Sequence, residues 1–191
     1  MIQLHLGCGK CFIPGFVHID LADFPHIDHK KDIATLPMFE DSSVDLIYSS
    51  HTLEYFDRIE VVPVLKEWRR VLNNDGFLRI AVPDFESLSK LYSRKRQLAE
   101  VMGPLYGRWP IPGSKKVVYH KTTYDYTDLK HLLEVNGFKN VCRYDWHKTI
   151  HKDYDDYSQA YIPHMDKKHG TLISLNVEAQ KDSLRRLINE E

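Results

Sequence analysis

Glycines and acidic residues stand at three points in the first third of the chain where they can hold a ligand. Gly7-Cys8-Gly9 follows an apolar run directly, and glycines there let the backbone approach a ligand and turn its N–H groups toward it. Asp20 ends the next apolar run, where a carboxylate can accept two hydrogen bonds from a ribose diol. Asp32-Ile33 ends the third and offers an adenine ring a carboxylate and an apolar face. Together the three signals indicate one binding crevice.

Two histidines are candidates for proton transfer. His51 follows the apolar run 44–50 and is expected to point into the same crevice, where it can take a proton from a hydroxyl or an amine. His120 is the second candidate base, and for both the alternative is a histidine that only shapes the pocket. Asp84 is interpreted as the N-cap of the following helix. The acidic, aromatic segment 154–157 suits a sugar or a cation, and the alternative that we favour is a solvated loop.

Other chemistries fit the sequence less well. The dinucleotide fingerprint needs a further glycine at position 12, which is Phe12, and no P-loop sequence occurs. Cys8 and Cys11 form a C-x-x-C pair, but a structural zinc ion needs four ligands and the remaining cysteine, Cys142, is far along the chain. We therefore predict no metal site.

The apolar periodicity predicts the elements that position these residues. Strands are expected over residues 2–6, 16–20, 29–33, 44–50, 76–82, 139–146 and 171–179. Helices are expected over residues 63–72, 85–101 and 125–136, with a loop over 102–113. Strands that alternate with helices predict a parallel α/β sheet, whose ligand lies beyond the carboxyl ends of the strands. The last two strands have no helix between them, so they can pair antiparallel at one edge.

Length and charge exclude several classes of protein. A chain of 191 residues is expected to form one domain, here residues 1–181, followed by a charged tail over 182–191. Lys and Arg number 26 against 27 Asp and Glu, a formal charge of −1, which argues against nucleic acid as the main partner and against a membrane surface. An odd count of three cysteines without a secretory signal predicts a cytoplasmic protein.

In order and spacing, these residues resemble the class I S-adenosylmethionine-dependent methyltransferases. The string Leu4-His5-Leu6-Gly7-Cys8-Gly9 is similar to the first motif of that family, residues 41–54 to its strand-four motif, and residues 67–78 to the helix and turn that follow. The resemblance implies a Rossmann-like, doubly wound, mostly parallel seven-stranded sheet with an antiparallel last strand. It also implies that S-adenosylmethionine contacts Gly7, Cys8, Gly9, Asp20, Leu21, Asp32, Ile33, Ser49 and Ser50.

The sequence departs from the family pattern in its first crossover. His5 stands where the family commonly has an acidic residue, and Cys11 where it has a third glycine. Only residues 10–15 lie between Gly9 and the second strand, whereas a parallel crossover normally takes a dozen residues or more. We therefore expect the first crossover helix to be shortened to a turn or absent. Loops at about 103–121 and 148–169 are expected to close the pocket and to recognise the acceptor.

The resemblance implies an enzyme that methylates an oxygen or a nitrogen of a small-molecule or sugar-like acceptor. One alternative is a non-catalytic S-adenosylmethionine-binding or interaction protein of the same fold. A second is a relative that transfers the aminopropyl group of the donor, which nothing in the sequence selects.

Overall fold

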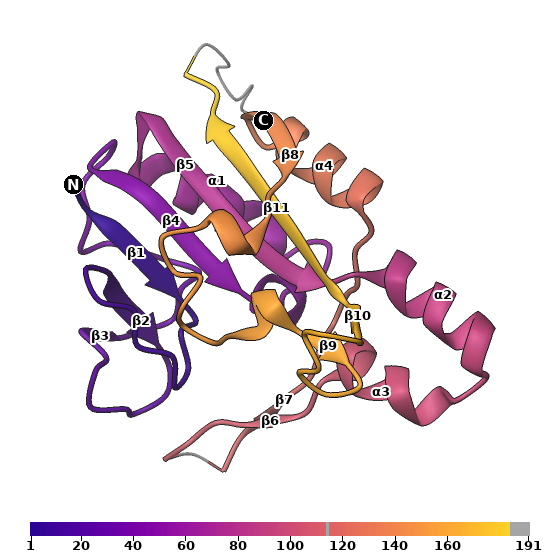
Figure 1. Cartoon of the computed structure of the whole chain (residues 1–191). Helices are drawn as coiled ribbons and strands as arrows, with labels where there is room; N and C mark the ends of the chain where they lie inside the picture. The colour runs from indigo at the N-terminus through magenta and orange to yellow at the C-terminus, as the bar shows by residue number, and fades with distance from the viewer. Residues whose placement is uncertain (114, 184–191) are drawn as a thin grey trace.

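A twisted seven-stranded sheet forms the centre of the computed structural model, which describes residues 1–113 and 115–183 (Figure 1). In spatial order its strands are β3 (His29–Lys30), β2 (Val17–Asp20), β1 (Gln3–Leu6), β4 (Val44–Ser50), β5 (Leu72–Pro83), β11 (Ser174–Lys181) and β8 (Phe138–Arg143). The first five pair in parallel, while β11 runs antiparallel to both of its neighbours. This arrangement confirms the predicted fold class.

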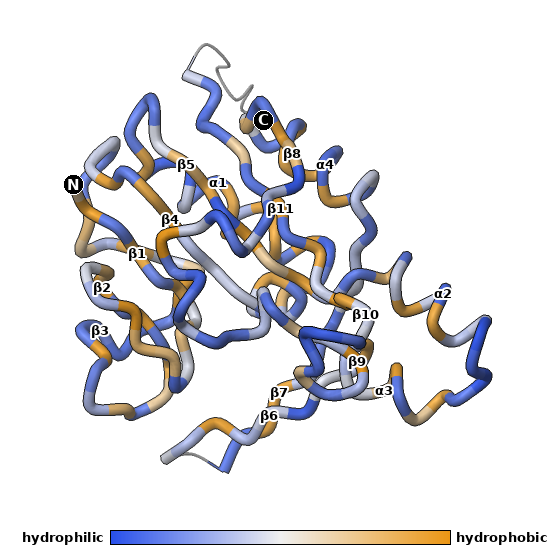
Figure 2. Tube along the Cα trace, viewed as in Figure 1, coloured by the Kyte–Doolittle hydropathy of each residue, from blue (hydrophilic) through white to orange (hydrophobic). Residues whose placement is uncertain are grey.

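The main core lies between the sheet and the two helices α1 (Val61–Val71) and α4 (Tyr126–Val135). Hydrophobic residues gather in the central strands, while the outer turns are mostly hydrophilic (Figure 2). Trp68 of α1 is fully buried, and its indole N–H donates to the carbonyl of Ile33 at 2.8 Å. The helix thereby fixes the segment that follows β3.

The region after β5 differs from the sequence prediction. In place of one helix over 85–101, two helices form, α2 (Phe85–Lys95) and α3 (Leu98–Tyr106), separated at Arg96, whose φ is 55°. The expected loop over 102–113 is therefore wrong in its first part. The apolar spacing of α3 continues through that part, and buried Val101 packs on α2. A short hairpin of β6 (Trp109–Pro110) and β7 (Val117–Val118) follows.

Several strand ends also differ from the prediction. The expected turn over 73–76 lies inside β5, which begins at Leu72 directly after α1. The segment 171–179 divides into β10 (Thr171–Leu172), which pairs with β9 (Tyr161–Ile162), and the longer β11. Strand β3 has two residues, and β8 ends at Arg143, before the 3-10 turn η2 (Trp146–Lys148). Of the predicted tail, residues 184–191 lie outside the described residues.

Helices α2 and α4 each begin at a capping aspartate. The Asp84 carboxylate accepts a hydrogen bond from the N–H of Glu86 at 3.1 Å, so the N-cap interpretation is confirmed. Asp125 caps α4 by accepting from the N–H of Asp128 at 2.9 Å. These caps satisfy N–H groups that helix ends leave unpaired.

The connection from β1 to β2, residues 7–16, contains no helix, as the sequence predicted. Gly7 and Gly9 have φ values of 66° and 54°, in the left-handed region that favours glycine. The N–H of Gly9 donates to the Asp20 carboxylate at 2.8 Å, and the N–H of Ile13 donates to His18 Nε2 at 3.0 Å. Hydrogen bonds from β2 side chains thus hold the connection in place of helical packing.

The sheet face opposite α1 is covered by residues 144–173, which include η2 and the turn η3 (Tyr157–Gln159) (Figure 1). The Tyr48 hydroxyl donates to the Asp156 carboxylate, and the Asn176 amide donates to the carbonyl of Ser158 at 2.8 Å. The interpretation of 154–157 as a solvated loop is therefore wrong for Asp156, whose side chain is tied to the sheet, while Asp155 and Tyr157 are exposed.

Gly7 and Gly9 allow a matched test of the first connection. A Cβ on Gly7 would lie 2.4 Å from Thr52 Oγ1, whereas a Cβ on Gly9 would meet no described heavy atom within 4 Å. We expect Gly9→Ala to lower the free energy of unfolding by about 1–2 kcal/mol through backbone strain alone. Gly7→Ala should cost about 1–3 kcal/mol more because of the steric clash. Equal losses of unfolding free energy for the two variants, measured in urea, would show that Thr52 does not limit the space at Gly7.

A second prediction concerns the covering segment. Tyr48→Phe should lower the free energy of unfolding by about 1–3 kcal/mol, because the half-buried Asp156 carboxylate loses a hydrogen-bond donor. It should also speed proteolysis within residues 144–173. Tyr126→Phe is the control, since its hydroxyl donates to the carbonyl of Val141 at 3.1 Å, away from this segment. A Tyr48→Phe protein with the parent's proteolysis pattern would show that the contact does not anchor the segment.

Candidate functional site

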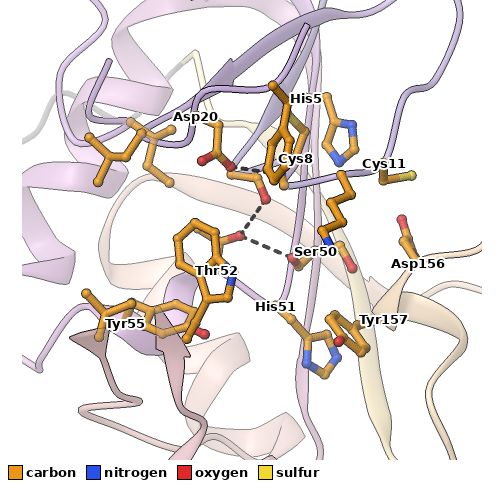
Figure 3. Close-up of a pocket in the computed structure, with 18 of the residues that line it drawn as sticks. His5, Cys8, Cys11, Asp20, Ser50, His51, Thr52, Tyr55, Asp156 and Tyr157 are labelled. Carbon is orange, nitrogen blue, oxygen red and sulfur yellow. Dashed lines mark hydrogen bonds between the residues drawn. The ribbon is translucent and has the colours of Figure 1, made fainter. Parts of the chain in front are cut away.

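A cavity of about 720 Å³ opens beyond the carboxyl ends of β1, β2 and β4, a size usual for small-molecule sites (Figure 3). Asp20 and Cys8 lie near one end, and His51 and Tyr157 near the other. The predicted site residues that line it are Gly7, Cys8, Gly9, Asp20, Leu21, Asp32, Ile33, Ser50 and His51. Ser49 and His120 are not among the described residues that line it. Successive strand residues point to opposite faces of the sheet, so Ser49 points away from the cavity that its neighbour Ser50 lines. Ser49 is fully buried.

Asp20 ties the glycine turn to the end of β2. Its carboxylate accepts from the N–H of Gly9 at 2.8 Å and from the N–H of Ala22 at 2.7 Å. The side chain is 4% exposed. A carboxylate has about four acceptor positions, so two of them stay open for a ligand in the cavity.

The segment Asp32-Ile33 forms another part of the wall. Asp32 accepts from the N–H of Ala34 at 2.9 Å, and Trp68 holds the carbonyl of Ile33. Leu21 and Phe24, from the loop after β2, also line the cavity. This part of the cavity offers apolar side chains beside an exposed carboxylate.

Thr52 is a wall residue that the sequence analysis missed. Its hydroxyl lies 3.1 Å from the carbonyl of Ser50 and 3.4 Å from that of Gly7, so it bridges the ends of β4 and β1 (Figure 3). Tyr55 and Phe56 follow it along the same wall. The sequence signal that could have identified these residues as part of the cavity wall was their position directly after His51.

Both predicted loops reach the cavity. The hairpin of β6 and β7 contributes Trp109, Ile111 and Val118. These apolar side chains in a Pro- and Gly-rich segment were a signal that the sequence analysis did not use. From the covering segment, the lining residues are Asp155, Asp156, Tyr157, His164 and Met165.

His51 borders the cavity in a strained conformation, with φ at 50°. Its Nε2 lies 3.1 Å from Ser174 Oγ, and its Nδ1 lies 3.6 Å from Glu54 Oε1. Burial, with a smaller contribution from His120, lowers the pKa of His51 to about 3. The imidazole is therefore neutral at physiological pH, and the pKa near 6.5 usual for an exposed histidine does not apply.

His120 lies behind the cavity wall. Its Nδ1 is 2.9 Å from the carbonyl of Pro104, and its Nε2 is 3.7 Å from Glu54 Oε1. Burial lowers its pKa. Its ring also packs edge-on against Tyr55, with centroids 4.9 Å apart. His51 and His120 thus meet at one buried carboxyl group, but of the two His51 alone reaches the cavity.

The two cysteines at the glycine turn are free. Burial raises the pKa of Cys8, and burial raises that of Cys11 to about 12. Both thiols are therefore protonated at neutral pH, whereas the thiolate is the metal ligand and the nucleophile. Within residues 1–113 and 115–183, no group of three or more His, Cys, Asp or Glu side chains is arranged to hold a metal ion.

Comparison with known proteins relates part of the chain to one family. Residues 14–80 match the methyltransferase domain family. A search of curated protein sequences gave no match. No helix among the described residues is long and apolar enough to cross a membrane.

Solved structures share the fold over nearly the whole chain. A SAM-dependent methyltransferase from Methanosarcina mazei is 19% identical, with a TM-score of 0.54 over 94% of this chain and 91% of its own. One from Archaeoglobus fulgidus is 16% identical, with a TM-score of 0.56 over 94% and 85%. The Burkholderia thailandensis 1,6-didemethyltoxoflavin-N1-methyltransferase, solved with its substrate and S-adenosylhomocysteine, is 12% identical, with a TM-score of 0.55 over 94% and 70%.

At these identities the solved structures show the fold, and the family match over residues 14–80 supplies the sequence relationship. Residues 14–80 thus match the methyltransferase domain family, and the fold of the chain is that of the class I S-adenosylmethionine-dependent methyltransferases.

Proposed function

We propose that this protein transfers the methyl group of S-adenosylmethionine to an oxygen or nitrogen of a small molecule, such as a sugar-like compound, bound in the cavity. One observation carries the proposal. A single cavity joins the glycine turn and Asp20 at one end to a wall of His51, Tyr157 and Trp109 from separate segments. It has room for a nucleoside at one end and for an acceptor at the other.

The cofactor is assigned to the end formed by β1 and β2. The Asp20 carboxylate, with two acceptor positions open, binds the ribose hydroxyls. The adenine ring lies between Leu21 and Ile33, with Asp32 accepting from its amino group. The glycine turn, Gly7-Cys8-Gly9, then lies along the methionine part, where backbone N–H groups can approach closely.

The acceptor is assigned to the space between the hairpin and the covering segment. The aromatic side chains Trp109, Tyr55 and Tyr157 offer flat apolar surfaces, and Asp155 adds a carboxylate. Such a wall suits a ring with hydroxyl or amine groups. The Burkholderia relative, whose name describes N-methylation of a small heterocycle, supports a small acceptor by analogy. The formal charge of −1 argues against nucleic acid.

Cofactor binding tests the ribose assignment. S-adenosylhomocysteine should bind with a dissociation constant on the order of micromolar, ~−8 kcal/mol, while NAD should show no binding. Asp20→Ala should weaken binding by about 1–3 kcal/mol, because the ribose hydroxyls lose a charged acceptor. The measurement is isothermal titration calorimetry on protein whose fold is checked by circular dichroism.

Asp75→Ala is the control, since Asp75 is exposed in β5 and away from the cavity lining. Unchanged affinity in folded Asp20→Ala protein would remove the ribose assignment. Binding of S-adenosylhomocysteine without transfer of labelled methyl to any acceptor would instead support a non-catalytic cofactor-binding protein.

His51 is proposed to assist a hydroxyl acceptor at the cavity wall. Because its Nε2 faces Ser174 Oγ at 3.1 Å and its Nδ1 faces Glu54 Oε1 at 3.6 Å, it acts as a base only after its ring turns one nitrogen toward the acceptor. His51→Ala should lower kcat by about 10²–10⁴-fold and leave cofactor affinity nearly unchanged. His120→Ala should have a smaller effect, because that ring lies behind the wall, and His131→Ala on the exposed face of α4 should have none. With the pKa of His51 at about 3, the parent should show no loss of rate near pH 6.5.

The test uses steady-state rates of all three variants between pH 5 and 9. Full turnover in both His51→Ala and His120→Ala would mean that neither histidine is the base. The acceptor would then have to be nucleophilic already at neutral pH.

A further inference from the structure

Glu54, in the 3-10 turn η1 (Leu53–Tyr55) behind His51, is the most deeply buried acidic residue near the site. Its exposed fraction is 0%, and neither carboxyl oxygen has a hydrogen-bond partner among the described residues. An ionised carboxylate in such a place is very costly. The proposed reaction so far gives this residue no part.

Two histidines from distant parts of the chain face the same oxygen of Glu54. His51 Nδ1 lies 3.6 Å and His120 Nε2 lies 3.7 Å from Oε1, just beyond hydrogen-bond length. Tyr55 and Tyr124 are also close, since a charge on Glu54 adds to burial in raising the pKa of each phenol. The Lys121 ammonium, which is on the neighbouring segment, pairs with Glu60 at 2.6 Å instead.

The hydrogen-bond chain beyond His51 fixes which ring nitrogen carries its proton. The Asn176 amide N–H donates to the carbonyl of Ser158 at 2.8 Å, so its oxygen faces Ser174. The Ser174 hydroxyl therefore donates to Asn176 at 2.9 Å and accepts from His51 Nε2. With its proton on Nε2, a neutral His51 directs the lone pair of Nδ1 at Glu54.

The hydrogen bonds of His120 likewise fix which of its ring nitrogens carries the proton. The carbonyl of Pro104 can only accept, so His120 Nδ1 carries the proton of that 2.9 Å hydrogen bond. Its Nε2 then directs a second lone pair at Glu54 Oε1. Two lone pairs that face one buried carboxyl oxygen, at 3.6 and 3.7 Å, disfavour a negative charge on that oxygen and favour its protonated form.

Burial decides where that proton resides. It raises the pKa of Glu54 to about 8 and lowers the pKa of both His51 and His120. The proton therefore stays on the carboxyl group at neutral pH, and both imidazoles stay neutral.

We propose that Glu54 is a positioning residue that works as a neutral carboxylic acid, which keeps its proton and directs the O–H toward His51 Nδ1 or His120 Nε2. This O–H group holds His51 in one tautomer at the cavity wall. It also ties that wall to residues 119–122, which follow the hairpin that closes the cavity. The link to methyl transfer rests on the proposed function, but the protonation of Glu54 does not.

This proposal gives a definite pH dependence of stability. The folded-state pKa of Glu54, about 8, lies above its ordinary value of 4.5. Between these values the unfolded chain loses the proton while the folded chain keeps it, so this group lowers stability as pH rises from about 4.5 to 8. Glutamine at position 54 has the same shape, can donate a hydrogen bond and does not titrate.

The experiment compares Glu54→Gln, Glu54→Leu and the exposed control Glu40→Gln by thermal unfolding between pH 5 and 9 and by steady-state kinetics. Glu54→Gln should keep kcat within about threefold of the parent, and its Tm relative to that of the parent should rise between pH 5 and 8, whereas the Tm of Glu40→Gln relative to the parent should stay constant. Glu54→Leu, which has no donor, should lower kcat about tenfold or more. Nitrogen-15 NMR should show His51 as the neutral Nε2–H tautomer in both the parent and Glu54→Gln.

Two results would overturn the proposal: a Tm difference between Glu54→Gln and the parent that stays constant from pH 5 to 8, or a His51 that is an imidazolium at pH 7. A Glu54→Gln enzyme as slow as Glu54→Leu would also overturn it. The unfolding and NMR measurements need no methyl transfer. If they give the expected results while S-adenosylhomocysteine fails to bind, the proposed function fails and the assignment of Glu54 stands.

Discussion

The connection between β1 and β2 is too short to hold a helix, and much of the site depends on this constraint. A parallel crossover normally packs a helix on the sheet, but residues 7–16 contain none. Asp20 instead binds the N–H of Gly9, and His18 binds that of Ile13. The glycine turn therefore takes its shape from side chains of β2. The same shortness leaves the adjoining sheet face, with His5 and Tyr48, without helical cover.

The covering segment 144–173 replaces the helix on that face. A helix would need an apolar surface to pack on, whereas this face carries His5, Tyr48 and Asn176. An irregular segment can meet such side chains one at a time, as Asp156 meets Tyr48 and the carbonyl of Ser158 meets Asn176. Because the segment crosses the sheet toward its carboxyl edge, it also brings Tyr157 to the cavity. One stretch of chain thus covers this face of the sheet and also supplies part of the cavity wall.

Local sequence signals were enough to predict the sheet and the end of the cavity that Asp20 and Asp32 line. Asp20 and Asp32 end short apolar runs, and parallel strands bring their carboxyl ends to one edge. The meeting of His51, Glu54 and His120 was not predictable in this way. His120 reaches Glu54 through the path of α3 and the hairpin, and the sequence analysis mistook the end of α3, residues 102–106, for a loop. The packing of Val101 on α2 set that path, and no local pattern encodes such a contact.

A neutral wall beside the acceptor space fits the charge changes of the proposed reaction. The sulfonium of the donor is positive before transfer and becomes a neutral thioether, so positive charge spreads toward the acceptor in the transition state. An ionised carboxylate directly behind His51 would stabilise the concentrated charge of the ground state more than the dispersed charge that follows it, which raises the barrier. With Glu54 protonated and His51 neutral, the wall avoids this effect. Asp155, at the exposed rim, pairs with Lys167 at 3.0 Å and is screened by solvent. The chain then contributes mainly by holding donor and acceptor in line.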